Sequence, residues 1–153
     1  MQLNGILSLQ SGFPLNLGLS GAAPYAVSRP SRVAGQAAAT SGAIVDRLGG
    51  VSSATPYISP AAFRLPQSFE FGAAPRLMPD LRGPGIRNVD LSIFKNFPIR
   101  EQFHLQLRAE TFNGFNTPRF GNPGTTFNTP SFGVIGSQQN TPRQIQLAAK
   151  LIF

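Results

Sequence analysis

The strongest constraint on this chain is the alternation of apolar and mostly polar side chains at its carboxyl end, in residues 143–153. Successive side chains of a β-strand point to opposite faces of a sheet, so residues two apart share a face. One face of this segment is entirely apolar, with Ile145, Leu147, Ala149, Leu151 and Phe153. The other face is mostly polar, with Gln144, Gln146 and Lys150 beside Ala148 and Ile152. The pattern predicts a strand that separates an apolar environment from a polar one.

Three earlier segments, residues 2–10, 87–97 and 102–113, show the same alternation. Their polar faces carry Asn88, Asp90 and Ser92 in the second segment and His104, Gln106, Arg108 and Glu110 in the third. The 16 glycines and 14 prolines of the chain disfavour helices. We therefore predict an all-β fold in which four antiparallel strands are joined by irregular connections.

The predicted connections alternate between short and long. Residues 98–101 form a tight turn between the second and third strands, whereas residues 11–86 and 117–142 are long segments rich in small and turn-forming residues. Such long loops are unusual in compact soluble domains. Barrels of the bacterial outer membrane, in contrast, combine short periplasmic turns with long extracellular loops. The loop lengths therefore favour a membrane barrel.

Alternation alone fits both a soluble sheet that covers a core and a barrel whose apolar face meets lipid. Phenylalanines gather at the strand ends, as interfacial girdles require: Phe97, Phe103 and Phe153 near the tight turn, and Phe13, Phe112 and Phe115 near the long loops. No helical segment is available to cover the apolar faces, so a soluble version would leave them bare. These features together predict the carboxy-terminal section of a large transmembrane barrel.

In that barrel the polar side chains face the lumen. The predicted lumen-facing residues are Asn88, Asp90, Ser92, His104, Gln106, Arg108, Glu110, Gln144, Gln146 and Lys150. Charged side chains on the polar face of a strand are usually only solvated. The alternative is a specific pairing of Arg108, Glu110 and Asp90 in the lumen.

Composition argues against several other classes of function. The chain has no cysteine, which removes disulfides, thiolate metal sites and thiol nucleophiles. Its net charge of +7 comes from scattered residues without a basic run, so we expect no nucleic-acid partner. A metal site is disfavoured because His104, the single histidine, shares its face with Arg108. Ser92, His104 and Asp90 are regular strand positions without a nucleophile elbow, so we expect no catalytic residue and no cofactor.

The start of the chain has neither a secretory signal nor the ~20 apolar residues of a membrane-spanning helix. Alternation nevertheless begins directly after Met1. We therefore interpret Met1 as an internal methionine or a misplaced start, and expect a secretion signal upstream of it.

Six segments occur in a characteristic order: LQSGFP at 9–14, RGPGIRNVDLSIFKNF at 82–97, LQLRAETFN at 105–113, FNTP at 115–118, FGNP at 120–123 and PRQIQL at 142–147. In order and spacing they resemble the TonB-dependent receptors, in particular the branch with an Oar-like barrel that is abundant in acidobacteria. The resemblance covers nearly all of the second half of the chain and a short stretch near its start. It implies a barrel of about 22 strands around a plug, in the outer membrane of a Gram-negative bacterium.

The resemblance also implies the partners of such a barrel. These are outer-membrane lipid, the remaining strands and the plug, and the TonB complex, which would be contacted through an amino-terminal region missing from this chain. A further partner is the barrel-assembly machinery, which would recognise Phe153 and the alternating apolar residues before it, Ile145, Leu147, Ala149 and Leu151.

The expected function is therefore that of the last four strands of a TonB-dependent receptor, which contribute to substrate uptake but do not act alone. One alternative is an outer-membrane barrel for surface assembly or protein export. A second alternative, from another class, is a soluble β-sheet module such as a carbohydrate-binding one. The sequence does not indicate the substrate.

Overall fold

The computed structural model describes residues 1–21, 29–42 and 55–153. The chain divides into two compact units. Unit 1 comprises Met1–Ser11, Gly85–Arg119 and Gln139–Phe153, and unit 2 comprises Gly12–Pro84 and Phe120–Gln138. In the described ranges, all regular secondary structure is β-strand, apart from a single-turn 3-10 helix, η3 (Pro60–Ala62). No helix of the described part is long and apolar enough to span a membrane.

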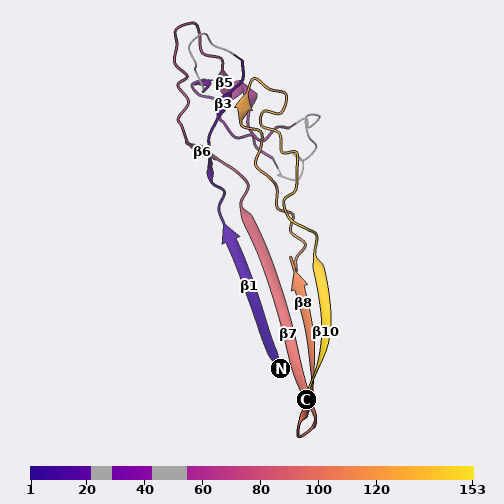
Figure 1. Cartoon of the computed structure of the whole chain (residues 1–153). Coiled ribbons are helices and arrows are strands. Elements are labelled where there is room, and N and C mark those ends of the chain that lie inside the picture. The colour runs from indigo at the N-terminus through magenta and orange to yellow at the C-terminus, as the bar shows by residue number, and fades with distance from the viewer. Residues whose placement is uncertain (22–28, 43–54) are drawn as a thin grey trace. The chain divides into compact units, whose positions relative to one another are not determined.

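Unit 1 is one antiparallel sheet with the strand order β1-β7-β8-β10 (Figure 1). Its strands are β1 (Gln2–Gln10), β7 (Ile86–Arg100), β8 (Phe103–Phe112) and β10 (Gln144–Ile152). They coincide, within a few residues at each end, with the four segments that alternation predicted. Because neighbouring strands are antiparallel, both long connections leave the sheet at the end opposite to the β7–β8 turn.

The β7–β8 turn lies later in the chain than the sequence suggested. β7 continues through Pro98 to Arg100, which pairs with Phe103, so that Glu101 and Gln102 form the turn. The register shifts between Pro98 and Arg100. Such an irregularity accommodates proline in a strand, because proline has no N–H to donate to the ladder. The predicted turn at 98–101 is therefore wrong in its first residues.

Burial in this sheet is inverted relative to a soluble protein. Gly5, Leu91, Thr111 and Ile145 lie opposite one another across the four strands, so the odd-numbered residues share one face. We call it the apolar face, and most of its large side chains are exposed, with Leu147 at 76%. Among the described residues, every buried hydrophobic side chain belongs to unit 2, whereas the one buried residue of unit 1 is Asn113.

The sheet is open at both edges. In the described part of the chain, β1 pairs only with β7 and β10 pairs only with β8. Even the smallest closed barrels use about 8 strands. Closure therefore needs further strands beside β1 and β10.

Unit 2 is built from the two long connections. Its strands are β2 (Pro14–Leu15), β3 (Gly18–Leu19), β4 (Ser31–Arg32), β5 (Phe63–Arg64), β6 (Met78–Arg82) and β9 (Thr126–Phe127). Antiparallel pairs form between β2 and β6 and between β4 and β5. The parallel pair of β3 with β9 joins the first connection to the second. The connections have little regular structure, as predicted, but they pack against each other.

A hydrophobic core holds unit 2 together. Leu17, Ile58, Met78 and Leu81 are almost completely buried in it. Within it, the ring of Phe132 lies 5.7 Å from that of Phe63 between centroids, in an edge-to-face arrangement. Full burial of one such aliphatic side chain contributes roughly 1.5–3 kcal/mol, more than the ~0–1 kcal/mol of an exposed ion pair. Apolar packing is therefore the main force that orders these connections.

The Glu70 carboxylate links separate segments of unit 2 through hydrogen bonds. It accepts hydrogen bonds from Arg64 Nη1 at 2.8 Å and Nη2 at 2.6 Å, from Gln67 N at 2.8 Å and from Ser31 Oγ at 2.9 Å. The hydrogen bonds from Arg64, followed by those from Gln67 and Ser31, lower the pKa of Glu70 to about 2. The folded state therefore favours the ionised carboxylate.

Glu70→Gln is expected to loosen unit 2 at neutral pH. A folded pKa of about 2, below the ordinary 4.5, means that the carboxylate stabilises the fold above pH 4.5 and that this contribution is lost as the pH falls toward 2. Amide hydrogen exchange in residues 63–70 should therefore be faster in the variant at pH 6 and equal to wild type near pH 2. Glu101→Gln in the β7–β8 turn is the control. Equal exchange in Glu70→Gln and wild type at pH 6 would contradict this role.

Candidate functional site

The ten polar residues predicted to face a lumen all lie on one face of the sheet in unit 1. Ser92 lies opposite Glu110, and Glu110 lies opposite Gln146. The same even-numbered register brings in the remaining members: Asn88, Asp90, His104, Gln106, Arg108, Gln144 and Lys150. We call this surface the polar face and take it as the candidate functional surface.

The charge pairing that was considered from the sequence forms only in part. Arg108 makes an ion pair with Glu110. Its guanidinium carbon also lies 5.1 Å from the ring centroid of Phe94, an aromatic residue of the polar face that alternation did not single out. Asp90 does not join this pair, because its carboxylate accepts hydrogen bonds from Asn88 Nδ2 and from the backbone N–H of Asn113. The alternative in which Asp90 completes the pairing is therefore wrong.

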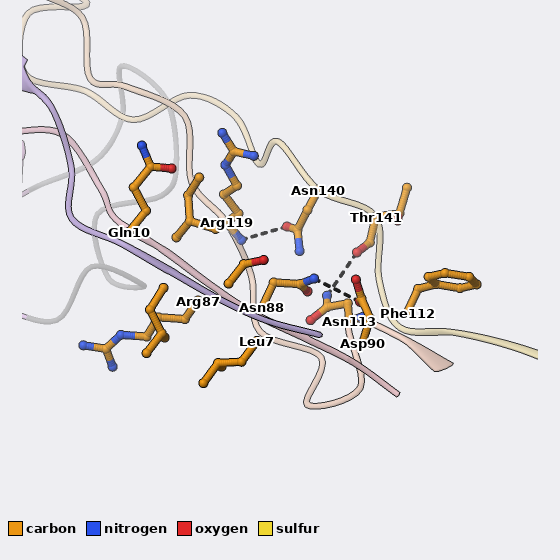
Figure 2. Close-up of a pocket in the computed structure, with 13 residues that line it drawn as sticks. Leu7, Gln10, Arg87, Asn88, Asp90, Phe112, Asn113, Arg119, Asn140 and Thr141 are labelled. Atoms are coloured by element: carbon orange, nitrogen blue, oxygen red, sulfur yellow. Dashed lines mark hydrogen bonds between the residues drawn. The ribbon is translucent and has the colours of Figure 1, made fainter. Parts of the chain in front are cut away.

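An open pocket of about 630 Å³ lies at the end of the sheet from which the long connections leave (Figure 2). Its walls are formed by the ends of β1, β7 and β8 and by residues of the segments that follow β8 and precede β10. The lining residues are Leu7, Ser8, Leu9, Gln10, Ile86, Arg87, Asn88, Asp90, Phe112, Asn113, Arg119, Asn140 and Thr141. Figure 2 shows Arg119 and Asn140 on one side of the strands and Leu7 and Arg87 on the other.

Asn113 fastens the end of β8 to both of these segments. Its Nδ2 donates to the carbonyl oxygens of Thr117 at 3.3 Å and Thr141 at 3.2 Å, and its Oδ1 accepts the Thr117 N–H at 2.8 Å. Its own N–H donates to Asp90 Oδ1 at 2.9 Å. Its φ of 51° lies in the left-handed region, which asparagine tolerates better than most residues. Asp90 and Asn113 therefore form the junction at which the sheet ends.

Arg119 brings a positive charge to the pocket. Its backbone N–H donates to Asn140 Oδ1 at 2.7 Å, and its carbonyl accepts the Gln139 N–H at 2.7 Å. Asn140 Nδ2 in turn donates to the Thr117 carbonyl at 2.9 Å. The backbone of Arg119 is thus anchored while the side chain stays exposed. With amide, hydroxyl and carboxylate groups nearby, this pocket can hydrogen-bond polar solutes, and Arg119 favours those that carry negative charge.

The polar face does not assemble a catalytic triad from Ser92, His104 and Asp90. Ser92 lies opposite Glu110, and His104 is six positions further along β8, a separation of about 20 Å at the usual rise of a strand. A proton cannot pass directly over that distance. In the ranges that the structure describes, no three His, Asp or Glu side chains are grouped so that they could hold a metal ion.

The apolar face carries the terminal residues predicted to act in assembly. Ile145, Leu147, Ala149 and Leu151 lie opposite Thr111, Ala109, Leu107 and Leu105 of β8. Phe153 follows β10, and its ring centroid is 6.5 Å from that of Phe103, so these two rings of the girdle near the turn lie together.

The predicted girdle near the long loops is wrong. Phe112 lies opposite Gln144 and therefore belongs to the polar face. Phe13 is part of unit 2, so Phe115 is the one member of this predicted girdle that is an exposed residue of unit 1 and is not on the polar face. Alternation identifies a face only inside a strand, so residues beyond the strand end could not be assigned to one.

Sequence reasoning missed the roles of Asn113, Arg119 and Asn140. Asn113 was taken as the last residue of the third strand segment, although β8 ends at Phe112, and the other two lie in predicted loops, where no periodicity exists. The Asn113-Gly114 pair is a turn signal that could have marked the junction. Two cations of the apolar face, Arg87 and Lys95, were also overlooked, although counting in twos from Val89 reaches both.

Asn113→Ala is expected to destabilise the sheet by about 1–3 kcal/mol, because it leaves the backbone groups of residues 117 and 141 without their partners. Equilibrium unfolding of the complete protein in denaturant measures this loss. Asn113→Gly is the matched variant, because it relieves the left-handed backbone but also removes the amide. Wild-type stability in Asn113→Gly would show that backbone conformation, and not the hydrogen bonds, makes Asn113 necessary.

The model of a protein family described as an outer membrane beta barrel domain matches residues 1–146 of the chain. A search of curated proteins and a search of solved structures found no match. The matched range includes β1, β7 and β8 and the beginning of β10, the strands whose apolar side chains are left exposed. An exposed apolar face is the expected surface of a sheet surrounded by lipid. This protein is located in the outer membrane, and its chain belongs to the outer membrane beta barrel domain family.

Proposed function

We propose that the sheet of unit 1 is part of the wall of a TonB-dependent receptor and contributes to substrate uptake across the outer membrane. The observation that supports this most is the inverted burial of the sheet, whose apolar face is exposed while its polar side chains gather on the other face. In a barrel the exposed face meets lipid and the polar face lines the lumen. The ten polar residues then border the path of the substrate.

Uptake requires parts beyond these four strands. The open edges of β1 and β10 support further strands on both sides. In the receptors that the sequence resembles, the barrel encloses a plug. An amino-terminal region, and not the barrel wall, contacts the TonB complex. The remaining strands, a plug and the TonB complex are therefore included in the proposal as partners.

The proposal also fixes an orientation. Short turns of outer-membrane barrels are periplasmic and long loops are extracellular, so the β7–β8 turn and Phe153 lie on the periplasmic side. Unit 2, which contains both long connections, is then extracellular. Phe153 and the exposed apolar residues of β10 are in this arrangement available to the barrel-assembly machinery.

A barrel for surface assembly or protein export is the second candidate, since it would have the same sheet. The order of the six sequence segments favours the receptor, and the pocket beside Arg119 offers groups that bind polar solutes. A soluble carbohydrate-binding module is disfavoured, because it would leave an entire apolar face in water.

The uptake function can be tested by measuring which compounds cells remove from their medium. Cells with and without the complete barrel are compared, each with and without a protonophore. A receptor driven through TonB should deplete particular compounds only when both the barrel and the proton-motive force are present. Unchanged media, together with altered surface proteins, would favour assembly or export instead.

Two neighbouring residues of β10 test the assignment of the faces. Leu147→Arg places a charge on the lipid face and should cost roughly 2–4 kcal/mol near the bilayer middle, whereas Gln146→Arg on the lumen side should cost little. The amount of folded barrel in the outer membrane, measured by heat-modifiable gel mobility, should fall for Leu147→Arg only. If both variants assemble equally well, the lipid and lumen faces have been assigned wrongly.

A further inference from the structure

Two positive charges interrupt the apolar face. Arg87 lies opposite Leu9, and Lys95 lies opposite Leu107. Both side chains belong to β7 and are exposed. Among the paired positions before the register shift at Pro98, they are the charged residues of this face. Beyond the shift, Arg100 lies opposite Phe103 beside the β7–β8 turn.

Neither charge is balanced within the sheet. The ion pairs found in the described part of the chain are Arg32–Asp80, Arg64–Glu70 and Arg108–Glu110, so Arg87 and Lys95 have no acidic partner there. A cation inside a lipid-facing band is costly unless its charged end reaches the polar interface. The charged ends of both side chains must therefore reach the polar interface, where the phosphate groups of lipids lie.

Arg87 lies near the start of β7, and Lys95 lies five residues before its last residue. Arg87 and Lys95 are eight residues apart on this strand, about 26 Å at the usual rise per residue. A strand tilt of about 35–45° reduces this to a height of about 19–21 Å. The apolar band of outer-membrane barrels is about 25 Å tall, so a pair centred on the band has both Cα atoms a few ångströms inside its borders.

The long side chains bridge the remaining distance. Lys95 Nζ lies 4.7 Å from the ring centroid of Phe97, which is two residues nearer the β7–β8 turn. The lysine thus extends along the face toward the periplasmic border and holds its charge over an aromatic ring. Arg87 lies near the start of β7, and Figure 2 shows it on the side of the strands away from Arg119 and Asn140.

We propose that Arg87 and Lys95 bind the phosphate groups of membrane lipids, Arg87 in the outer leaflet and Lys95 in the inner leaflet, and thereby fix the depth of the sheet in the membrane. The planar guanidinium of Arg87 matches two oxygens of one phosphate, and the ammonium of Lys95 acts as a point charge. The inference rests on the lipid-facing orientation within the proposed function. It does not depend on TonB or on uptake.

Depth-dependent quenching tests the position of both residues. Cysteine is introduced singly at Arg87, Leu91 and Lys95 of a cysteine-free complete barrel, labelled with bimane and placed in vesicles whose lipids carry a nitroxide either near the headgroup or deep in the acyl chain. Positions 87 and 95 should be quenched more by the shallow nitroxide, and position 91 by the deep one. Stronger quenching by the deep nitroxide at all three positions would overturn the proposed phosphate binding but not the lipid-facing orientation. No quenching at position 91 would overturn the lipid-facing orientation itself.

Folding yield tests the binding of phosphate lipids. Wild type, Arg87→Gln, Lys95→Gln and the polar-face control Lys150→Gln are refolded into phosphatidylcholine vesicles with and without phosphatidylglycerol. Phosphatidylglycerol should increase the folding yield of wild type, and this increase should be roughly fivefold smaller in Arg87→Gln and in Lys95→Gln, because each cation near an anionic surface contributes about 1 kcal/mol. The increase should be unchanged in Lys150→Gln. Equal losses in Lys150→Gln, or full gains in Arg87→Gln and Lys95→Gln, would overturn the proposal. If Lys95→Gln does not fold, Lys95→Arg should restore both folding and the gain.

Discussion

The antiparallel register of β1, β7, β8 and β10 is the interaction on which the rest of this protein depends. Inside a membrane no water is available to backbone N–H and C=O groups, so each of them must find a partner in the neighbouring strand. Once the ladder supplies these partners, alternate side chains are free to be apolar toward lipid and polar on the opposite face. A slip by one residue would exchange the two faces, which makes the register a condition for membrane insertion as well as for pairing.

The two units of the chain meet the cost of exposed apolar surface in different ways. The sheet buries almost no hydrophobic side chain of its own, since lipid provides its apolar surroundings. The long connections have no such solvent, so Leu17, Ile58, Met78 and Leu81 form a core within unit 2. This explains how connections with few regular elements become ordered: their packing depends on side chains and not on long ladders.

Polar residues of the sheet serve different purposes although they share one face. Arg108 and Glu110 compensate each other's charge, whereas Asp90 holds the backbone of Asn113 at the end of β8. Asp90 is thus part of the junction between the sheet and its loops, and it is a poorer candidate for direct contact with a substrate than the exposed Arg119 nearby. Arg87 and Lys95 interrupt the opposite, apolar face and have no acidic partner among the described residues.

The sequence by itself determined the four strands, their two faces and the ten residues of the polar face, because alternation is a local property that needs only the spacing between residues two apart. It could not determine the core of unit 2 or the Asn113 junction. Those depend on contacts between distant positions: Asn113 with Thr141, Ser31 with Glu70, and Asn128 with Ser20, which are 28, 39 and 108 residues apart. Only the tertiary structure decides which of many polar side chains meet, because such contacts follow from the path of the chain and leave no periodic trace in the sequence.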